Sequence, residues 1–159
     1  MKTLVLVRHA KSSWDEPDLE DEERPLNERG EHDAPRMAKR LAGTGIRPDV
    51  ILSSTARRAR TTAEIFGEEL GVDVEADQRL YGASPATIVA VVAERGVDSV
   101  LVVAHDPGLS VLAGRFAAEI VHMPTCAVAT FTWADDIDSW DTAFASAPLS
   151  WRFDAPRLS

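Results

Sequence analysis

Short apolar, β-favouring runs alternate along the chain with longer amphipathic segments, and this alternation most limits the folds that it can adopt. The clearest runs, residues 3–7 and 99–104, are almost continuously apolar, which suits strands that are covered on both faces. We also expect strands at 50–52, 72–76 and 127–133, and an edge strand at 149–153.

Four segments between these strands are predicted to be helices, at residues 27–41, 53–70, 85–92 and 106–120. Pro35 lies inside the first, so we expect a bend or a late start there. Ser53 and Ser54 are expected to supply N-cap hydroxyls to the second helix. Asp106 and Pro107 are expected to be the N-cap and first position of the fourth.

Strands that alternate with helices predict a mainly parallel sheet with helices on both faces, a three-layer α/β/α sandwich. With 159 residues, the chain fits one domain, residues 1–159. Apolar residues make up 45% of it and charged residues 27%, as in soluble globular proteins.

The net charge of -9 argues against nucleic acid or an anionic membrane as a partner, because such binding needs a basic face. A local basic pocket remains compatible with this charge. The apolar start of the chain ends at Arg8, which is too short for a signal peptide or a membrane span, so we expect a cytoplasmic protein. Cys126 is the single cysteine and is expected to be a buried, inert thiol.

Three of the predicted strands run into cationic or imidazole residues. Arg8 and His9 follow the first strand, a helix start that carries Arg58 follows the second, and His105 follows strand 99–104. In open α/β sheets the binding crevice lies beyond the carboxyl ends of the strands. The three strand ends together therefore predict an anion site at one edge of the sheet.

The residue types at this edge suit a phosphoryl group. A guanidinium offers a rigid fork of donors to two phosphate oxygens, and His105 stands where a helix N-terminus favours an anion. Phosphoryl transfer needs little more than an in-line nucleophile and cations around the oxygens. There is no Walker loop, and no carboxylate pattern accompanies His9 and His105, so we expect no metal.

Four short motifs follow one another along the chain: Arg8-His9-Ala10, residues 24–30 (RPLNERG), residues 54–63 and residues 103–108. In this order they resemble the histidine phosphatase superfamily, from residue 1 to about residue 115. The variant Arg8-His9-Ala10-Lys11-Ser12 and the compact length look most like the phosphohistidine phosphatases of SixA type. Alignment of the third motif places the family's second phosphate arginine at Arg58.

The resemblance implies a role for each central residue. His9 would attack phosphorus and become a phosphohistidine, which water then hydrolyses. Arg8, Arg58 and His105 would hold the phosphoryl oxygens and spread the transition-state charge. No metal or other cofactor is implied, and the partner would be a phosphorylated protein or a small phosphorylated metabolite.

Several neighbouring residues are open to two interpretations. Lys11 and Arg24 are candidate substrate-binding residues at the pocket rim, or ordinary surface. Arg57 and Arg60 are expected to form a solvated helix face. Trp14 lies next to the proposed site in sequence, and a contact with substrate is the less favoured of its two interpretations.

One departure from the family bears on the substrate. Larger members place an acidic proton donor shortly after the third strand, where residues 79–84 (RLYGAS) contain no carboxylate. An alkoxide leaving group would need that proton, whereas a phosphoramidate nitrogen can arrive already protonated. Asp15, Glu16 or Asp18 of the acidic segment 15–23 could supply the proton instead. That segment is otherwise expected to be solvated charge, or a rim that repels nucleotides or engages a basic partner.

These observations predict a metal-independent phosphatase that acts on phosphohistidine, on a protein. A phosphomonoesterase for a small metabolite, a phosphoglycerate mutase-like enzyme and a non-catalytic phosphate-binding module remain alternatives. The intact set of Arg8, His9, Arg58 and His105 argues against the last of these.

Overall fold

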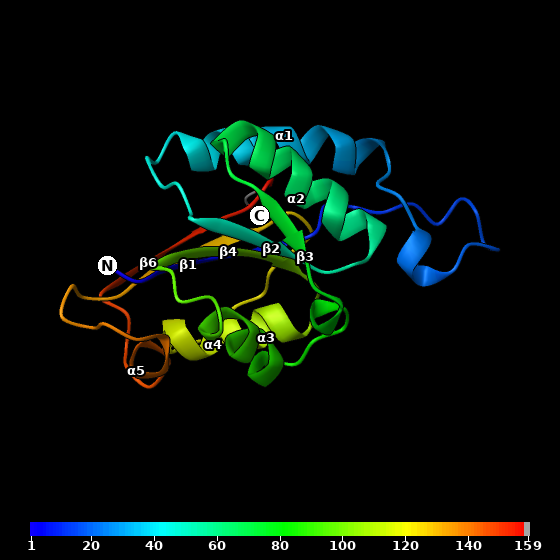
Figure 1. Cartoon of the computed structure of the whole chain (residues 1–159). Helices are drawn as coiled ribbons and strands as arrows, with labels where there is room; N and C mark the ends of the chain where they lie inside the picture. The colour runs from blue at the N-terminus through cyan, green and yellow to red at the C-terminus, as the bar shows by residue number, and fades with distance from the viewer. Residues whose placement is uncertain (158–159) are drawn as a thin grey trace.

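The computed structural model describes residues 1–157, and its strands form one six-stranded sheet (Figure 1). The strands are β1 (Thr3–Arg8), β2 (Val50–Ser53), β3 (Val74–Ala76), β4 (Ser99–Ala104), β5 (Val128–Thr132) and β6 (Ser150–Asp154). Their order across the sheet is β3-β2-β4-β1-β5-β6. The first four are mutually parallel, and β5 runs antiparallel to both β1 and β6. The predicted mainly parallel sheet is confirmed, and the edge strand expected at 149–153 is found at residues 150–154.

Within residues 1–157, five α-helices cover the two faces of the sheet (Figure 1). One face carries α1 (Glu28–Ala42) and α2 (Arg57–Leu70), and the other carries α3 (Pro85–Ala93), α4 (Gly108–Ala117) and α5 (Trp140–Phe144). Short 3-10 turns, η1 (Asp21–Glu23) and η2 (Gln78–Leu80), complete the elements. The three-layer α/β/α sandwich is therefore confirmed. No helix among residues 1–157 has the length and apolarity that a membrane crossing requires.

Strand side chains alternate between two cores, as the pleat of a sheet requires. Val5 and Val7 of β1 pack in the core beneath α1 and α2, whereas Leu4 and Leu6 join the core beneath α3, α4 and α5. All four are fully buried. A strand buried on both faces explains why this stretch of sequence is continuously apolar rather than alternating.

Helix α1 starts next to the predicted position, but it is not interrupted at Pro35 as expected. Asn27 caps the helix, because its side chain accepts a hydrogen bond from the Gly30 amide at 2.9 Å. The helix begins at Glu28 and is continuous through Pro35, so the expectation of a late start there is wrong. Cα of Gly30 leaves no room for a Cβ, which would lie 2.2 Å from the carbonyl oxygen of Lys11. This close approach positions the loop that follows β1.

The helices that follow β2 and β4 begin differently from the prediction. Ser53 ends β2, and α2 begins only at Arg57 with no side-chain cap, so the predicted capping by Ser53 and Ser54 is wrong. The hydroxyl of Ser54 accepts a hydrogen bond from the Ala56 amide at 3.2 Å, ahead of the helix, and is also hydrogen-bonded to His105, a residue that the sheet brings alongside.

In α4, Pro107 takes the N-cap position rather than the first helical position. The helix stops at Ala117 because Ala118 turns to the left-handed conformation, so the predicted end at Ile120 is also wrong. Asp106 lies one position before the cap, and its carboxylate still accepts a hydrogen bond from the Ser110 amide at 3.0 Å.

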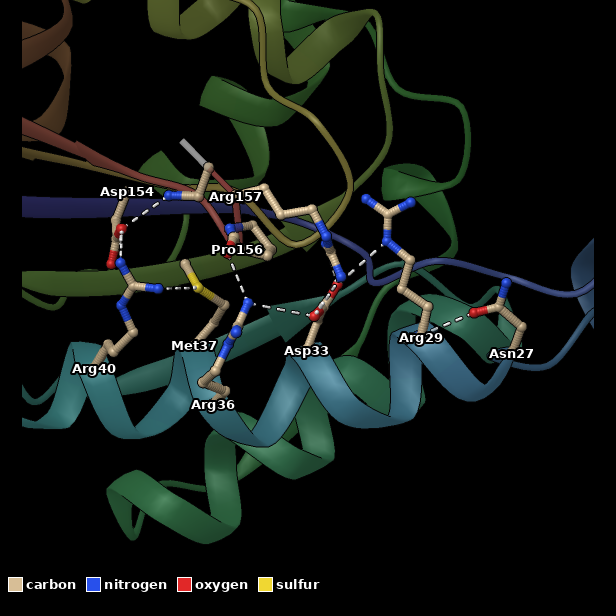
Figure 2. Close-up of polar contacts among 11 residues, drawn as sticks. Asn27, Arg29, Asp33, Arg36, Met37, Arg40, Asp154, Pro156 and Arg157 are labelled. Carbon is tan, nitrogen blue, oxygen red and sulfur yellow. Dashed lines mark hydrogen bonds and ion pairs between the residues drawn. The ribbon is translucent and has the colours of Figure 1, made fainter. Parts of the chain in front are cut away.

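A buried carboxylate ties the end of the described chain to α1. The side chain of Asp33 is fully buried and accepts hydrogen bonds from Arg157 at 2.8 and 3.2 Å, as Figure 2 shows. Arg36 lies 3.5 Å from the same carboxylate and donates to the Pro156 carbonyl at 2.7 Å. Arg29 approaches Asp33 to 3.7 Å. We call these four charged residues, with Pro156, the Asp33 cluster.

The carboxyl ends of three adjacent parallel strands meet at one edge of the sheet. Backbone hydrogen bonds between these segments continue past the ends of the strands. The His9 amide donates to the Ala104 carbonyl at 3.2 Å, and the Ser54 amide donates to the Val103 carbonyl at 3.0 Å. The central three strands thus deliver His9, Ser54 and His105 side by side.

Candidate active site

His9 emerges from the end of β1 and is almost completely buried. Its Nδ1 lies 2.8 Å from the carbonyl oxygen of Ala10. Because a carbonyl oxygen can only accept, Nδ1 carries the hydrogen and the lone pair is on Nε2. Burial is the main cause that lowers the pKa of His9 to about 3, and the charges of Arg58 and Arg8 act in the same direction. His9 is therefore a neutral imidazole at pH 7, the form that a nucleophile requires.

The loop that holds His9 is anchored to α2. The Ala10 amide donates to Thr62 Oγ1 at 3.0 Å, and the Thr62 hydroxyl donates in turn to the Arg58 carbonyl at 2.8 Å. Both groups are buried. One side chain therefore couples the backbone beside His9 to the turn of helix that carries Arg58.

His105 stands opposite His9, with 5.2 Å between the two ring centroids. Its Nε2 is hydrogen-bonded to Ser54 Oγ at 2.7 Å, and the ring of Tyr81 meets it edge-on at 5.5 Å. Burial first and the charge of Arg58 next lower the pKa of His105 to about 4. Both imidazoles are thus uncharged at pH 7.

Gly108 allows the helix after His105 to approach the segment before α3. A Cβ on Gly108 would lie 2.2 Å from the carbonyl oxygen of Ala83. Only glycine therefore fits at this position, and the contact holds the loop of Tyr81 against the start of α4.

Arg58 lies in the first turn of α2 and directs both of its terminal nitrogens to Asp21 of η1. It donates to the Asp21 backbone carbonyl at 2.6 Å and to the carboxylate at 2.9 Å. The same carboxylate accepts from Arg24 at 2.9 Å and from the Tyr81 hydroxyl. The hydrogen bond from Tyr81, followed by that from Arg58, lowers the pKa of Asp21 to about 2. We call Asp21, Arg24, Arg58 and Tyr81 the Asp21 cluster.

Arg8 approaches the site from the end of β1. One terminal nitrogen donates to the Met123 carbonyl at 2.9 Å and lies 3.8 Å from the Asp106 carboxylate. Its Nε is buried and has no hydrogen-bond partner among residues 1–157. Because buried donors are nearly always paired in proteins, this nitrogen is a donor suited to an incoming anion.

The structure brings together four of the predicted residues, Arg8, His9, Arg58 and His105, since the charges of both arginines act on both imidazoles. Arg24 joins them through Asp21.

Lys11 is a different case. Among the described residues its side chain makes no hydrogen bond or ion pair, and it lines a separate surface hollow that also contains Trp14 and Asn27.

Two arginines of α2 and one tryptophan near the site have exposed side chains. Arg57 and Arg60 are exposed, in agreement with the predicted solvated face. The exposed ring of Trp14 stacks on the Arg24 guanidinium, 3.4 Å from its carbon to the ring centroid. Its observed contact is thus with Arg24.

Three residues of the site were not predicted: Ser54, Tyr81 and Asp21. Ser54 lies in a motif but was interpreted as a helix cap, and Tyr81 lies in the segment without a carboxylate. Asp21 belongs to the acidic segment. The acids suggested there instead, Asp15, Glu16 and Asp18, are exposed and form no side-chain hydrogen bond or ion pair within residues 1–157.

Fold and site together define a three-layer α/β protein with two neutral histidines and a set of arginines at the carboxyl edge of its sheet. Residues 4–83 match the sequence profile of the histidine phosphatase superfamily, branch 1. An uncharacterized chloroplastic protein of Arabidopsis thaliana is 30% identical over 96% of this chain and 76% of its own length.

Two solved structures resemble the whole architecture. The proposed phosphohistidine phosphatase SixA of Agrobacterium tumefaciens superposes with a TM-score of 0.80 at 30% identity, over 98% of this chain and 99% of that one. The protein histidine phosphatase SixA in complex with tungstate superposes with a TM-score of 0.73 at 26% identity, over 84% and 89% of the two chains. The chain therefore belongs to the histidine phosphatase superfamily, branch 1, and its architecture is SixA-like. This membership supports a phosphatase activity.

Proposed function

We propose that this protein is a metal-independent phosphatase that hydrolyses phosphohistidine on a protein through a phosphorylated His9. The observation that carries the proposal is the state of His9: neutral, with its hydrogen held on Nδ1 by the Ala10 carbonyl and its lone pair on Nε2. Arg8, Arg58 and His105 supply the surrounding donors. The two SixA structures described above bear the name of the same activity.

The first step transfers the phosphoryl group to His9. The Nε2 lone pair forms a bond to phosphorus while the bond between phosphorus and the substrate nitrogen breaks, and that electron pair stays on the leaving nitrogen. His9 becomes a phosphorylated imidazolium. Its Nδ1–H keeps the hydrogen bond to the Ala10 carbonyl, which stabilises the new positive charge.

The groups near His105 favour phosphohistidine over an ester. An alkoxide would need an acid beside it, but Asp21 is a carboxylate at neutral pH and the Tyr81 hydroxyl already donates to it. A substrate imidazole needs no such acid, because its second ring nitrogen can take a proton from solvent before cleavage and the ring then leaves neutral. The chemistry of the leaving group thus matches the groups present.

The second step restores the protein. A water oxygen attacks phosphorus, the bond to Nε2 breaks, and its electron pair returns to His9. The water gives up one proton to solvent, and hydrogen phosphate leaves. Arg8 and Arg58 stabilise the charge on the equatorial oxygens in both steps.

A test of this function compares a histidine-phosphorylated peptide with phenyl phosphate and 3-phosphoglycerate, with chelator present. We expect kcat/KM for phosphohistidine to exceed that for phenyl phosphate by at least about 100-fold, because general acid catalysis commonly contributes that much to an ester. His9→Ala should abolish turnover. The matched control His32→Ala replaces an exposed histidine of α1 and should leave it unchanged.

Protein quenched in alkali should also carry a phosphoryl group that is stable in base and labile in acid, as an N–P bond is. Preference for an ester would remove the phosphohistidine assignment, and loss of activity with chelator would overturn the metal-independent mechanism. Phosphate binding without any turnover would support the phosphate-binding module instead.

A further inference from the structure

The anion site of this protein already holds an anion of its own. The Asp21 carboxylate accepts hydrogen bonds from two guanidiniums, Arg58 and Arg24, and from the Tyr81 hydroxyl. Both arginine side chains are only 8% exposed. Arg58 is the arginine that the family resemblance assigns to a phosphoryl group, Arg24 is a candidate for the same role, and both are engaged by a residue of the acidic segment.

Both terminal nitrogens of Arg58 are engaged by Asp21 in this arrangement. One donates to the Asp21 carbonyl and the other to its carboxylate. A phosphoryl group that binds to the guanidinium fork in the usual two-oxygen geometry would need both. A phosphoryl group that takes the same pair of N–H groups must therefore displace Asp21.

The segment that carries Asp21 can leave without disturbing either core. None of the three residues of η1 is buried, and the Asp21 side chain is 47% exposed. The further side-chain contact of η1 is a hydrogen bond from Thr55 to Glu22 at 3.0 Å. Its removal thus breaks polar contacts, including those to the two largely buried guanidiniums, and exposes no apolar side chain of its own.

We propose that Asp21 is an internal competitor for the phosphoryl group, holding Arg58 and Arg24 in the free protein until a substrate displaces it. A phosphoryl dianion carries more charge than one carboxylate, so it prevails in the same cradle once bound. Displacement also releases Arg24, which makes its role as a substrate-binding residue conditional on Asp21. The inference rests on the proposed function only in that the displacing anion is a phosphoryl group.

The competition sets a free-energy cost that every phosphoryl ligand must overcome. Free phosphate must displace Asp21 with the binding energy of its own oxygens. A phosphoryl group attached to a larger molecule adds contacts outside the cradle. Asp21 thus weakens the binding of every phosphoryl ligand by a common factor, and a small phosphate has no further contacts that offset this cost.

The test measures binding of inorganic phosphate by calorimetry at pH 7 and constant ionic strength. We expect Asp21→Asn to bind phosphate about tenfold more tightly than the unmodified protein, since a charged hydrogen-bonding competitor is lost. Asp18→Asn is the matched control: it removes the same charge from the same segment, but Asp18 is exposed and has no side-chain polar contact within residues 1–157. Its affinity should stay within about twofold.

Tyr81→Phe provides a second variant that removes one of the three donors to Asp21 and leaves the segment unchanged in charge. It should tighten phosphate binding by a smaller factor than Asp21→Asn. Unchanged or weaker phosphate binding in Asp21→Asn would overturn the proposal. Equal tightening in Asp18→Asn would overturn it too, because general charge and not the cradle would then be the cause.

Steady-state kinetics separate competition from catalysis. A competitor predicts that Asp21→Asn lowers KM and leaves kcat unchanged, whereas a proton donor predicts a lower kcat that depends on the leaving group. The outcome is also independent of the substrate assignment. Tighter phosphate binding in Asp21→Asn, together with no turnover of phosphohistidine by the unmodified protein, would keep the competitor and remove the proposed function. Unchanged phosphate binding together with phosphohistidine turnover would remove the competitor and keep the proposed function.

Discussion

The Asp21 and Asp33 clusters are built from the same parts and arranged in opposite ways. Each sets one carboxylate among several guanidiniums. In the Asp33 cluster the carboxylate is fully buried and its arginine side chains are 41–50% exposed. In the Asp21 cluster the two arginine side chains are 8% exposed and the carboxylate is 47% exposed.

The difference in exposure indicates which carboxylate must stay paired with its arginines and which can be replaced. A buried charge cannot be left without an opposite charge, whereas an exposed one can be solvated when its partner leaves. Asp33 must therefore stay paired, and it fastens the end of the described chain to α1 (Figure 2). Arg58 and Arg24 need an anion, but Asp21 can move into water and another anion can replace it.

The largest contrast between the clusters is expected from Arg58→Ala. Loss of one preorganised donor to the transition state should lower kcat/KM for phosphohistidine by about 100- to 1,000-fold. Arg36→Ala, in the Asp33 cluster, is the matched control and should leave kcat/KM near its original value. Stopped assays of phosphate release measure both. A similar loss in the two variants would show that the clusters do not differ in this way.

Acidification should next separate the two regions, because only the site buries imidazoles. Unfolded histidines take up protons as the pH falls below about 6.5, whereas folded His9 and His105 stay neutral until the pH approaches about 3 and about 4. The unfolded state then binds more protons, so stability falls with falling pH. Between pH 7 and 5 the loss is about 2 kcal/mol for each histidine.

Urea unfolding at the two pH values measures this effect. In His9→Asn the loss between pH 7 and 5 should shrink by about 2 kcal/mol. His32→Asn, an exposed residue of α1 next to the Asp33 cluster, should leave the loss unchanged. An equal pH dependence in both variants would contradict the lowered pKa of His9.

The central residues of the site could be predicted from the sequence because their placement depends on local features. Arg8 ends an apolar strand, His9 and His105 directly follow apolar strands, and parallel strands bring their ends to one edge. Asp21 could not be assigned in this way: its partner Arg58 is 37 positions away, and the acidic segment has no periodicity that would position it.

Fold class and strand positions were predictable for a similar reason, whereas helix ends were not. Ser54 was taken as a cap because its hydroxyl precedes a helix. Its partner His105 is adjacent only because β2 and β4 are neighbours in the sheet. The end of α4 depends on Ala118, whose left-handed conformation no local pattern announces.

A smaller effect, on stability alone, is expected from Asp33→Ala. Loss of the buried carboxylate removes the hydrogen bonds that fasten Arg157 but leaves guanidiniums that water can solvate, so the free energy of unfolding should fall by about 1.5 kcal/mol. With saturating phosphate present, which supplies Arg58 and Arg24 with another anion, Asp21→Ala should change it by less than about 0.5 kcal/mol. Urea unfolding measures both changes, and phosphate affinity should respond only to Asp21→Ala. Equal destabilisation would remove the distinction between a permanent and a replaceable carboxylate.

The smallest effect is expected from Arg157→Ala, which tests how the Asp33 cluster shares its charge. Arg157 donates to both oxygens of Asp33, yet its side chain is 48% exposed, and Arg29 and Arg36 stay close to the carboxylate without it. The loss of stability should therefore be smaller than in Asp33→Ala. Once Asp33 is replaced, Arg157→Ala should add almost nothing, because residues that share one contact are not additive. Full additivity in the double variant, measured by urea unfolding, would mean that Arg157 stabilises the protein through contacts other than Asp33.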